Sequence, residues 1–257
     1  MITIKSSREI ELMKEAGRIV AIAHRKVREA IAPGVSTFEL DQIAEATIRS
    51  LGATPSFKGY GGFPGSICAS INQVIIHGIP SKKIKLKTGD IISIDIGACY
   101  KGYHGDSAMT HPVGPINETR ARLLEVTKAA LYEGLKFAKP NQRLSDISHA
   151  IEQYVTQFGF SVVKDFTGHG VGAALHEDPS VPNFGPAGCG PILRPGMTLA
   201  IEPMVNVGTW KVRVLGDDWT TVTQDGSDSA HFEHSIVITA EGYQILTKEE
   251  ENLDVQK

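Results

Sequence analysis

The segment KTGDIISID at residues 87–95 recurs as RPGMTLAIE at residues 194–202, at an offset of 107 residues. In both copies a basic residue, a glycine, an isoleucine and a final carboxylate stand at matching places. The same offset separates two stretches that run from a proline to a glycine, residues 33–52 and 140–159. Two matches at one offset indicate a chain built from two related halves, each with an acidic residue at the end of a strand.

The expected fold class is α+β, with halves at roughly residues 1–115 and 116–250 of a single domain over residues 1–257. Capping boxes, in which a serine is followed three residues later by a glutamate, mark helix starts at Ser6 and Ser36. Hydrophobic periodicity and turn residues predict the other elements. These are helices over 117–138 and 145–158, β structure over 66–77 and 90–110, a loop over 54–64, and strands with loops over 161–246.

The composition is that of a soluble globular protein and argues against several classes. Of the 257 residues, 41% are hydrophobic and 21% charged, and the net charge of -3 provides no basic surface for nucleic acid. The N-terminus has no apolar signal-sequence core, and no apolar run approaches a membrane span. Three cysteines, far apart and odd in number, indicate neither a disulfide framework nor a CxxC metal site. We therefore expect a reduced, cytoplasmic protein that binds neither membranes nor nucleic acid.

Five acidic and histidine side chains stand within apolar, strand-like segments, where a charge is costly unless a partner offsets it. They are Asp95, Asp106, His169, Glu202 and Glu233. One positive side chain would leave the four carboxylates largely uncompensated, whereas two divalent cations would balance them. A two-metal site is therefore the leading hypothesis for this set.

The first two carboxylates fall on a predicted hairpin whose register fixes their relation. A two-residue turn at Lys101-Gly102 places Asp106 opposite Gly97 and diagonal to Asp95, on the same face of the hairpin. Two like charges at this separation repel and raise a pKa unless a cation lies between them. For these two residues alone, a pair of solvent-facing aspartates is the alternative.

His169 is flanked by glycines at positions 168, 170 and 172, which let the backbone approach the imidazole closely. Glu202 and Glu233 have apolar neighbours and would need a cationic partner if no metal were present. His231 shares a strand face with Glu233, and we expect it to hydrogen-bond rather than ligate. Four carboxylates and one imidazole form a hard, oxygen-rich set suited to Mn, Fe or Co, with Zn as a further candidate. Such a centre indicates a hydrolase.

At these residues the sequence closely resembles type I methionine aminopeptidase, and the resemblance extends from about Ile4 to Thr247. The matching motifs, in order, are SICASINQVIIHGIP (66–80), IDI (94–96), HGDS (104–107), GHGVG (168–172), LHE (175–177), IEPM (201–204) and FEHSIV (232–237). The resemblance implies the pita-bread fold, in which two pseudo-symmetric α+β halves surround a dinuclear metal centre.

The resemblance also assigns roles to individual residues. It implies that the five side chains above are the ligands of two divalent ions (Co, Mn, Fe or Zn), with Asp106 and Glu233 bridging them. Glu202 is also expected to be the proton shuttle. His77 and His176 are expected to contact the substrate without ligating metal, and His176 to stabilise the developing oxyanion.

A methionine-binding pocket is implied as well, since apolar and aromatic walls suit an unbranched thioether. Its expected residues are Tyr60, Phe63, Cys68, Leu175 and Trp219. Aromatic residues in a glycine-rich loop could equally anchor that loop to the core. Residues 58–63 and 181–192 depart from the bacterial pattern, which leaves the shape of the pocket open.

The implied activity is metal-dependent removal of the N-terminal methionine from nascent proteins and peptides, preferentially when the second residue is small. Since the chain shows neither an N-terminal extension nor the helical insertion of type II enzymes, a short bacterial-type form is expected. The expected partner is the N-terminus of a nascent polypeptide, and the expected state is a monomer. An association with the ribosome is left open.

Two alternatives compete with this interpretation. A proline-specific aminopeptidase or prolidase of the same fold shares the five ligands, but usually carries an extra N-terminal domain for which 257 residues leave no room. A non-catalytic pita-bread protein used for binding would be expected to lack some ligands. All five are present here, together with His77 and His176.

Overall fold

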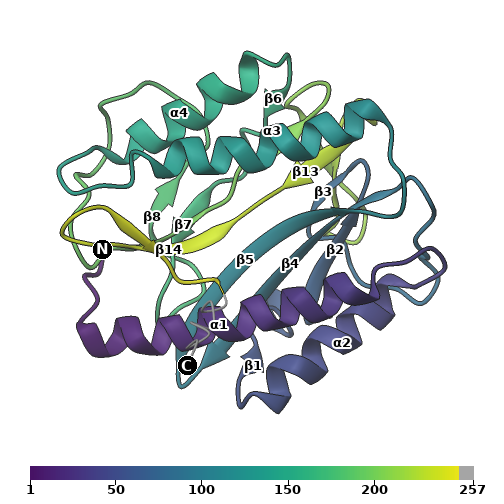
Figure 1. The fold of residues 1–257 in the computed structure, drawn as a ribbon, viewed down its shortest axis with the longest axis horizontal. Helices are drawn as coiled ribbons and strands as arrows, with labels where there is room; N and C mark the ends of the chain where they lie inside the picture. Colours follow the sequence, from purple (N-terminus) through teal and green to yellow (C-terminus); the bar gives the residue numbers. More distant parts are fainter. Residues whose placement is uncertain (249–257) are drawn as a thin grey trace, which may run out of the picture.

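The computed structural model describes residues 1–248. Residues 249–257 of the predicted domain, which include the last two residues of its predicted second half, lie outside the described residues. Two pairs of helices lie on opposite outer sides of the molecule, with the strands between them (Figure 1). The four α-helices of the described residues are α1 (Ser7–Ala30), α2 (Thr37–Ser50), α3 (Glu118–Leu135) and α4 (Leu144–Thr156). None of them is long and apolar enough to cross a bilayer.

Both predicted capping boxes are confirmed. At the start of α1 the Ser6 hydroxyl accepts the backbone N–H of Glu9, and the Glu9 carboxylate accepts the N–H of Ser6. Ser36 and Glu39 make the same reciprocal pair at the start of α2. These bonds satisfy backbone donors that a helix N-terminus otherwise leaves unpaired, which explains why the two helices begin where they do.

The predicted hairpin is the centre of the first half, and its register is confirmed. Asp106 pairs with Gly97, and Asp95 pairs with Ala108. The hairpin is part of a four-stranded antiparallel sheet. Another strand of this sheet, the short β1, lies within residues 54–64, for which the sequence predicts a loop. The strands of this sheet are β1 (Thr54–Pro55), β2 (Ile67–Ile71), β4 (Ile91–Tyr100) and β5 (Tyr103–Pro112).

The second half carries a five-stranded sheet in the order β15-β14-β9-β7-β8. Its strands are β7 (Gly168–Gly170), β8 (Glu177–Val181), β9 (Thr198–Ile201), β14 (His234–Ile238) and β15 (Tyr243–Ile245). Strand β9 begins 107 residues after β4, at the offset of the sequence repeat. Two three-stranded sheets complete the fold, made of β6 (Ser161–Val162), β10 (Met204–Asn206) and β13 (Ser229–His231), and of β3 (Val74–Ile76), β11 (Val212–Val214) and β12 (Thr221–Thr223).

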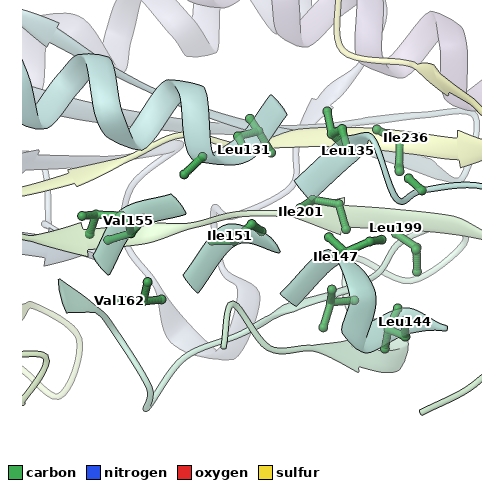
Figure 2. Packing of buried hydrophobic residues seen from close by; sticks show 14 of the residues in the cluster. Leu131, Leu135, Leu144, Ile147, Ile151, Val155, Val162, Leu199, Ile201 and Ile236 are labelled. Atoms are coloured by element: carbon green, nitrogen blue, oxygen red, sulfur yellow. The ribbon is translucent and has the colours of Figure 1, made fainter. Parts of the chain in front are cut away.

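Each helix pair covers its own hydrophobic core. Figure 2 shows the core of the second half, where side chains of α3 and α4 meet those of β9 and β14. Leu135 of α3 and Ile147 and Ile151 of α4 are fully buried, as is Ile201 of β9. Because Ile201 precedes Glu202, the burial of this strand fixes the position from which the acidic side chain projects.

The two halves are joined along a seam at the free edge of β5. The Asp106 N–H donates to Ser235 Oγ at 3.0 Å, and the Ser107 hydroxyl donates to the carbonyl of Glu233 at 2.7 Å. The Glu233 N–H in turn donates to the carbonyl of Ala108 at 2.8 Å. These bonds hold the backbones that carry Asp106 and Glu233 side by side.

Helix α1 approaches β5 and the C-terminal strand segment unusually closely at Gly17. A Cβ atom at Gly17 would lie 2.2 Å from the backbone oxygen of Leu246. A glycine-to-alanine change in an ordinary helix stabilises by about 1 kcal/mol. Here we expect Gly17→Ala instead to lower the free energy of unfolding by about 1–3 kcal/mol, because the contact is with backbone that cannot move aside. Urea denaturation would measure this, and an increase in stability would contradict the close approach.

Candidate metal centre and substrate cavity

The five predicted ligand residues lie together in one cavity of about 270 Å³. Ligand atoms of Asp106, His169 and Glu233 all lie within 4.8 Å of one another. His169 Nε2 is 3.5 Å from Glu202 Oε1 and 3.8 Å from Asp106 Oδ2. The carboxyl group of Asp95 is close enough to Asp106 and Glu202 for both to raise its pKa. The sequence prediction that these residues converge is confirmed.

Both halves contribute to the cluster. The hairpin strands β4 and β5 carry Asp95 and Asp106 on one face. His169 is the middle residue of β7, Glu202 directly follows β9, and Glu233 lies between β13 and β14. His169 is held in place from both sides because β7 pairs with β8 and with β9.

Burial dominates the electrostatics of the cluster. It is the largest cause of the raised pKa of all four carboxyl groups, and repulsion between neighbouring carboxylates adds to the shift at Asp95, Glu202 and Glu233. The pKa of His169 is lowered to about 4 by burial and by the nearby His176, so the ring is neutral at pH 7. Among residues 1–248, the only basic side chains in contact with these carboxylates are His169 and His231, and both rings are neutral at pH 7 because burial lowers their pKa.

The donor set fits divalent metal ions. Asp95 Oδ1, Asp106 Oδ1 and Glu233 Oε1 are buried and have no hydrogen-bond partner in the described part of the chain, which is costly unless a cation binds them. His169 Nδ1 lies 2.8 Å from the carbonyl of Gly170, so Nδ1–H donates there and the Nε2 lone pair faces the carboxylates. A second ring nitrogen fixed by a backbone carbonyl is the usual arrangement of a ligating histidine.

The two histidines predicted to contact substrate line the same cavity. His176 Nδ1 is 2.8 Å from the hydroxyl of Tyr60, and its ring centroid is 4.3 Å from that of His169. His77 packs edge-on against Trp219, with 6.0 Å between ring centroids. Its backbone has a φ of 58°, a left-handed conformation that is strained for a non-glycine residue and is often found at functional sites.

All five residues predicted to form the methionine pocket line this cavity, namely Tyr60, Phe63, Cys68, Leu175 and Trp219. Phe63, Cys68 and Leu175 form a buried cluster against which Trp219 packs. Phe57 was not predicted, although it belongs to the same cluster and lines the same cavity. Phe57 lies outside the matched motifs, and no pattern in the sequence distinguishes it from a core phenylalanine.

Two further residues support the cluster from behind. Asn183, which is fully buried in the atypical segment 181–192, donates its side-chain N–H to the carbonyl of Glu202 at 3.0 Å. No motif in the sequence singles out this asparagine. His231 Nε2 lies 3.4 Å from Glu202 Oε2, but among residues 1–248 it has no hydrogen-bond partner, so the hydrogen-bonding role expected for it stays a prediction.

A buried ion pair holds the loop that carries His176. Lys5 Nζ is 2.6 Å from Glu177 Oε2, and the two side chains are 4% and 15% exposed. Removing one partner of such a pair leaves a buried charge, which typically costs about 3–5 kcal/mol. We expect Lys5→Met to lower the free energy of unfolding by about 3 kcal/mol, measured by urea denaturation. The double variant Lys5→Met/Glu177→Met should lose less than the sum of the single variants, and strict additivity would contradict the pairing.

The family follows from a comparison of the whole chain with known proteins. The model of metallopeptidase family M24 matches residues 11–240. The chain belongs to metallopeptidase family M24. Membership implies that its centre uses divalent metal, in agreement with the buried carboxylates and the free Nε2 of His169. The predicted resemblance is thereby confirmed at the level of the family.

Individual M24 members show how similar the chain is to known proteins. Methionine aminopeptidase 1 of Bacillus subtilis strain 168 is 59% identical over 248 residues, which cover 96% of this chain and 100% of that protein. The crystal structure of methionine aminopeptidase from Thermotoga maritima is similar with a TM-score of 0.96 and 49% identity, covering 97% of this chain and 100% of that one.

A prolidase from Pyrococcus horikoshii OT3 is a more distant structural neighbour. Its TM-score is 0.79 and its identity 26%, and the match covers 97% of this chain but 65% of the prolidase. Both kinds of neighbour share the arrangement of helices and sheets described above. The predicted pita-bread fold is therefore confirmed.

Proposed function

We propose that the protein is a methionine aminopeptidase, a hydrolase that removes the N-terminal methionine from nascent proteins and peptides. The observation that carries this proposal is the single cavity in which the carboxylate–histidine cluster adjoins an apolar wall. The near full-length similarity to methionine aminopeptidases of Bacillus subtilis and Thermotoga maritima supports it. Preference for a small second residue is part of the proposal.

Two divalent metal ions per chain would be held by the five cluster residues. Two divalent charges match the four carboxylates, and His169 is neutral at pH 7. When bound, such ions lower the pKa of water and polarise a carbonyl oxygen. The oxygen-rich donor set suits Mn, Fe or Co, with Zn as a further candidate.

The side chains of the cavity have separate roles in proton transfer, oxyanion stabilisation and substrate binding. Glu202 receives the proton of the attacking water and passes it to the leaving amine, a general acid–base role. Tyr60 donates its hydroxyl proton to His176 Nδ1, which keeps a proton on Nε2. That Nε2–H can donate to the developing oxyanion. His77, which lines the same cavity and packs edge-on against Trp219, contacts the substrate backbone.

The apolar part of the cavity binds the methionine side chain. Phe63 and Trp219 pack edge-on with 5.1 Å between their ring centroids, and Cys68 and Leu175 are almost fully buried beside them. Aromatic rings and a polarizable thioether make favourable contacts worth about 0.3–1.5 kcal/mol each. A β-branched side chain is a poorer match for the same space than the unbranched side chain of methionine.

The cellular setting is proposed from the same argument. The substrate is the free N-terminus of a polypeptide as it is synthesised, so we place the enzyme in the cytoplasm. We further propose that it acts as a monomer. An association with the ribosome would bring it to its substrate and is part of this hypothesis.

A peptide assay tests the proposal. Metal-depleted protein supplied with Mn, Co or Fe is expected to release free methionine from Met-Ala-Ser, and little from Met-Leu-Ser, whose second residue is larger. A peptide with proline in the second position and no methionine, such as Ala-Pro-Ser, is the control. Cleavage of that peptide without methionine release under any metal would favour a proline-specific M24 enzyme instead.

A further inference from the structure

A second cavity lies at the seam between the two halves, outside the proposed catalytic site. Its volume is about 630 Å³, compared with about 270 Å³ for the substrate cavity, and the two share only Glu233 among their lining residues. Helices α1 and α3 form its sides, and residues 108–111 of β5 and 232–234 form its floor. Figure 1 shows these two helices on opposite sides of β5 and β14. We call it the seam cavity.

Three histidines give the seam cavity a polar inner wall. His24 is 3% exposed; its Nε2–H donates to the carbonyl of Ser107 at 2.8 Å, and its Nδ1 is buried without a partner among residues 1–248. His111 Nε2 is likewise buried and unpartnered. His234, by contrast, uses both ring nitrogens, with Tyr132 Oη at 3.2 Å and Thr247 Oγ1 at 2.9 Å. The two unpartnered nitrogens are shielded from the open space, so the polar contacts available to a ligand come from the rim.

The rim of the seam cavity is cationic and draws its charge from both halves. Arg28 of α1 and Lys128 of α3 line it, and both are exposed and close enough to His111 to lower its pKa. The acidic side chain on the rim, Glu125, is 3.2 Å from Arg122. The remaining acidic lining residue, Glu233, belongs to the carboxylate cluster. The field at the mouth therefore favours an anion.

Between the rim and the histidines the lining is apolar. Leu124 and Leu131 of α3, Phe232 on the floor and Ile245 of β15 face this space. A bare inorganic anion would leave such a surface without contacts. An anionic group attached to an apolar body would satisfy both the rim and the lining.

We propose that the seam cavity is a ligand site for a small organic anion, a phosphate, sulfonate or carboxylate carried on an apolar body. Arg28 and Lys128 bind the anionic group from opposite sides, with the guanidinium of Arg28 suited to a two-point contact. The apolar body lies against Leu124, Leu131 and Phe232. Because the ligand touches α1 and α3 together, its binding stabilises the association of the two halves. This site is independent of the proposed peptidase activity.

Isothermal titration calorimetry of the metal-loaded protein with phenyl phosphate tests the site. The rim variant Arg28→Met/Lys128→Met is compared with Lys26→Met/Lys136→Met, which removes two cations at exposed positions outside the cavity, one in α1 and one at the end of α3. Wild type and the control pair are expected to bind with equal affinity. The rim variant is expected to bind at least about tenfold more weakly, since it loses the charge-assisted hydrogen bonds that both cations donate to the anion. Far-UV circular dichroism checks that both variants are folded.

Other outcomes would overturn the proposal. Equal affinity in the rim variant would place phenyl phosphate at the metal centre, and no binding by wild type would leave the seam cavity without a ligand of this class. Equal loss in both double variants would indicate a general effect of net charge. Titrations with benzenesulfonate and benzoate show whether a sulfonate or a carboxylate binds in place of the phosphate. Benzyl alcohol, which lacks the anion, is expected not to bind, and its binding would refute the anionic requirement.

Discussion

Glu202→Ala is expected to reduce the rate of methionine release from Met-Ala-Ser by about 10³-fold or more. The change removes both a proposed metal ligand and the proposed proton shuttle, and general acid–base catalysis alone contributes about 10²–10⁴-fold. The rate of methionine release at saturating substrate measures the effect. Glu241→Ala, at an exposed position beyond β14, is the matched control and should leave the rate unchanged.

Stability gives an independent check on the same variant. In metal-free protein, burial and repulsion from Asp106 both raise the pKa of Glu202. The ionised carboxylate therefore destabilises the folded metal-free protein. Metal-free Glu202→Ala should therefore melt at a higher temperature than metal-free wild type, although it is less active with metal. A variant that keeps wild-type activity would refute the role of Glu202. A lower melting temperature of the metal-free variant would refute the repulsion.

Removal of metal is expected to lower the melting temperature by roughly 5–10 °C at pH 7.5. A ligand present at about 100 times its dissociation constant stabilises the folded state by about 2.7 kcal/mol, and each kcal/mol shifts the melting temperature by about 2–4 °C at this chain length. Calorimetry of dialysed and metal-reloaded samples measures the difference. An unchanged melting temperature would show that no metal binds the cluster.

The difference between metal-loaded and metal-free protein should grow with pH. Burial raises the pKa of Asp106 to about 7 and the pKa of the other three carboxyl groups well above their ordinary values. Between the ordinary and the raised pKa values the folded metal-free protein binds more protons than the unfolded chain, so its stability falls as pH rises.

Buried histidines act in the opposite direction but over a lower range. The pKa values of His77 and His169 are lowered to about 4 and that of His231 to about 3. These groups therefore add stability as pH rises from about 4 to about 6.5, above which their contribution is complete. From about pH 6.5 to 8 only the carboxylate effect remains, and metal-free protein should lose stability in that window. A flat metal-free profile there would contradict the raised pKa values.

The elements that the sequence predicts well are those with local physical causes. The capping boxes at Ser6 and Ser36 fix helix starts through bonds three residues apart. The turn at Lys101-Gly102 fixes the hairpin register, and that register alone is enough to place Asp95 and Asp106 on one face. The metal cluster could be predicted because carboxylates on buried strands are costly unless cations neutralise them.

The parts that sequence reasoning missed depend on distant segments. Asn183 bonds the carbonyl of Glu202 from a segment with no periodic pattern, and Phe57 lines the substrate cavity from outside every motif. The left-handed backbone of His77 was missed because histidine, although enriched in this conformation relative to most residues, adopts it only rarely. The seam cavity could not be predicted for the same reason, since it is lined by α1 and α3, two helices that are far apart in the sequence.

The seam also determines when the carboxylate–histidine cluster can form during synthesis of the chain. Asp106 is hydrogen-bonded to Ser235, which is 129 residues away in the sequence, and Ser107 is hydrogen-bonded to Glu233, which is 126 residues away. A partly synthesised chain can form the β4–β5 hairpin with two carboxylates, but it lacks the segments that bring the other ligands beside them. Contacts of such long range are slow to form. Assembly of the cluster is therefore among the last events of folding, after residue 235 has left the site of synthesis.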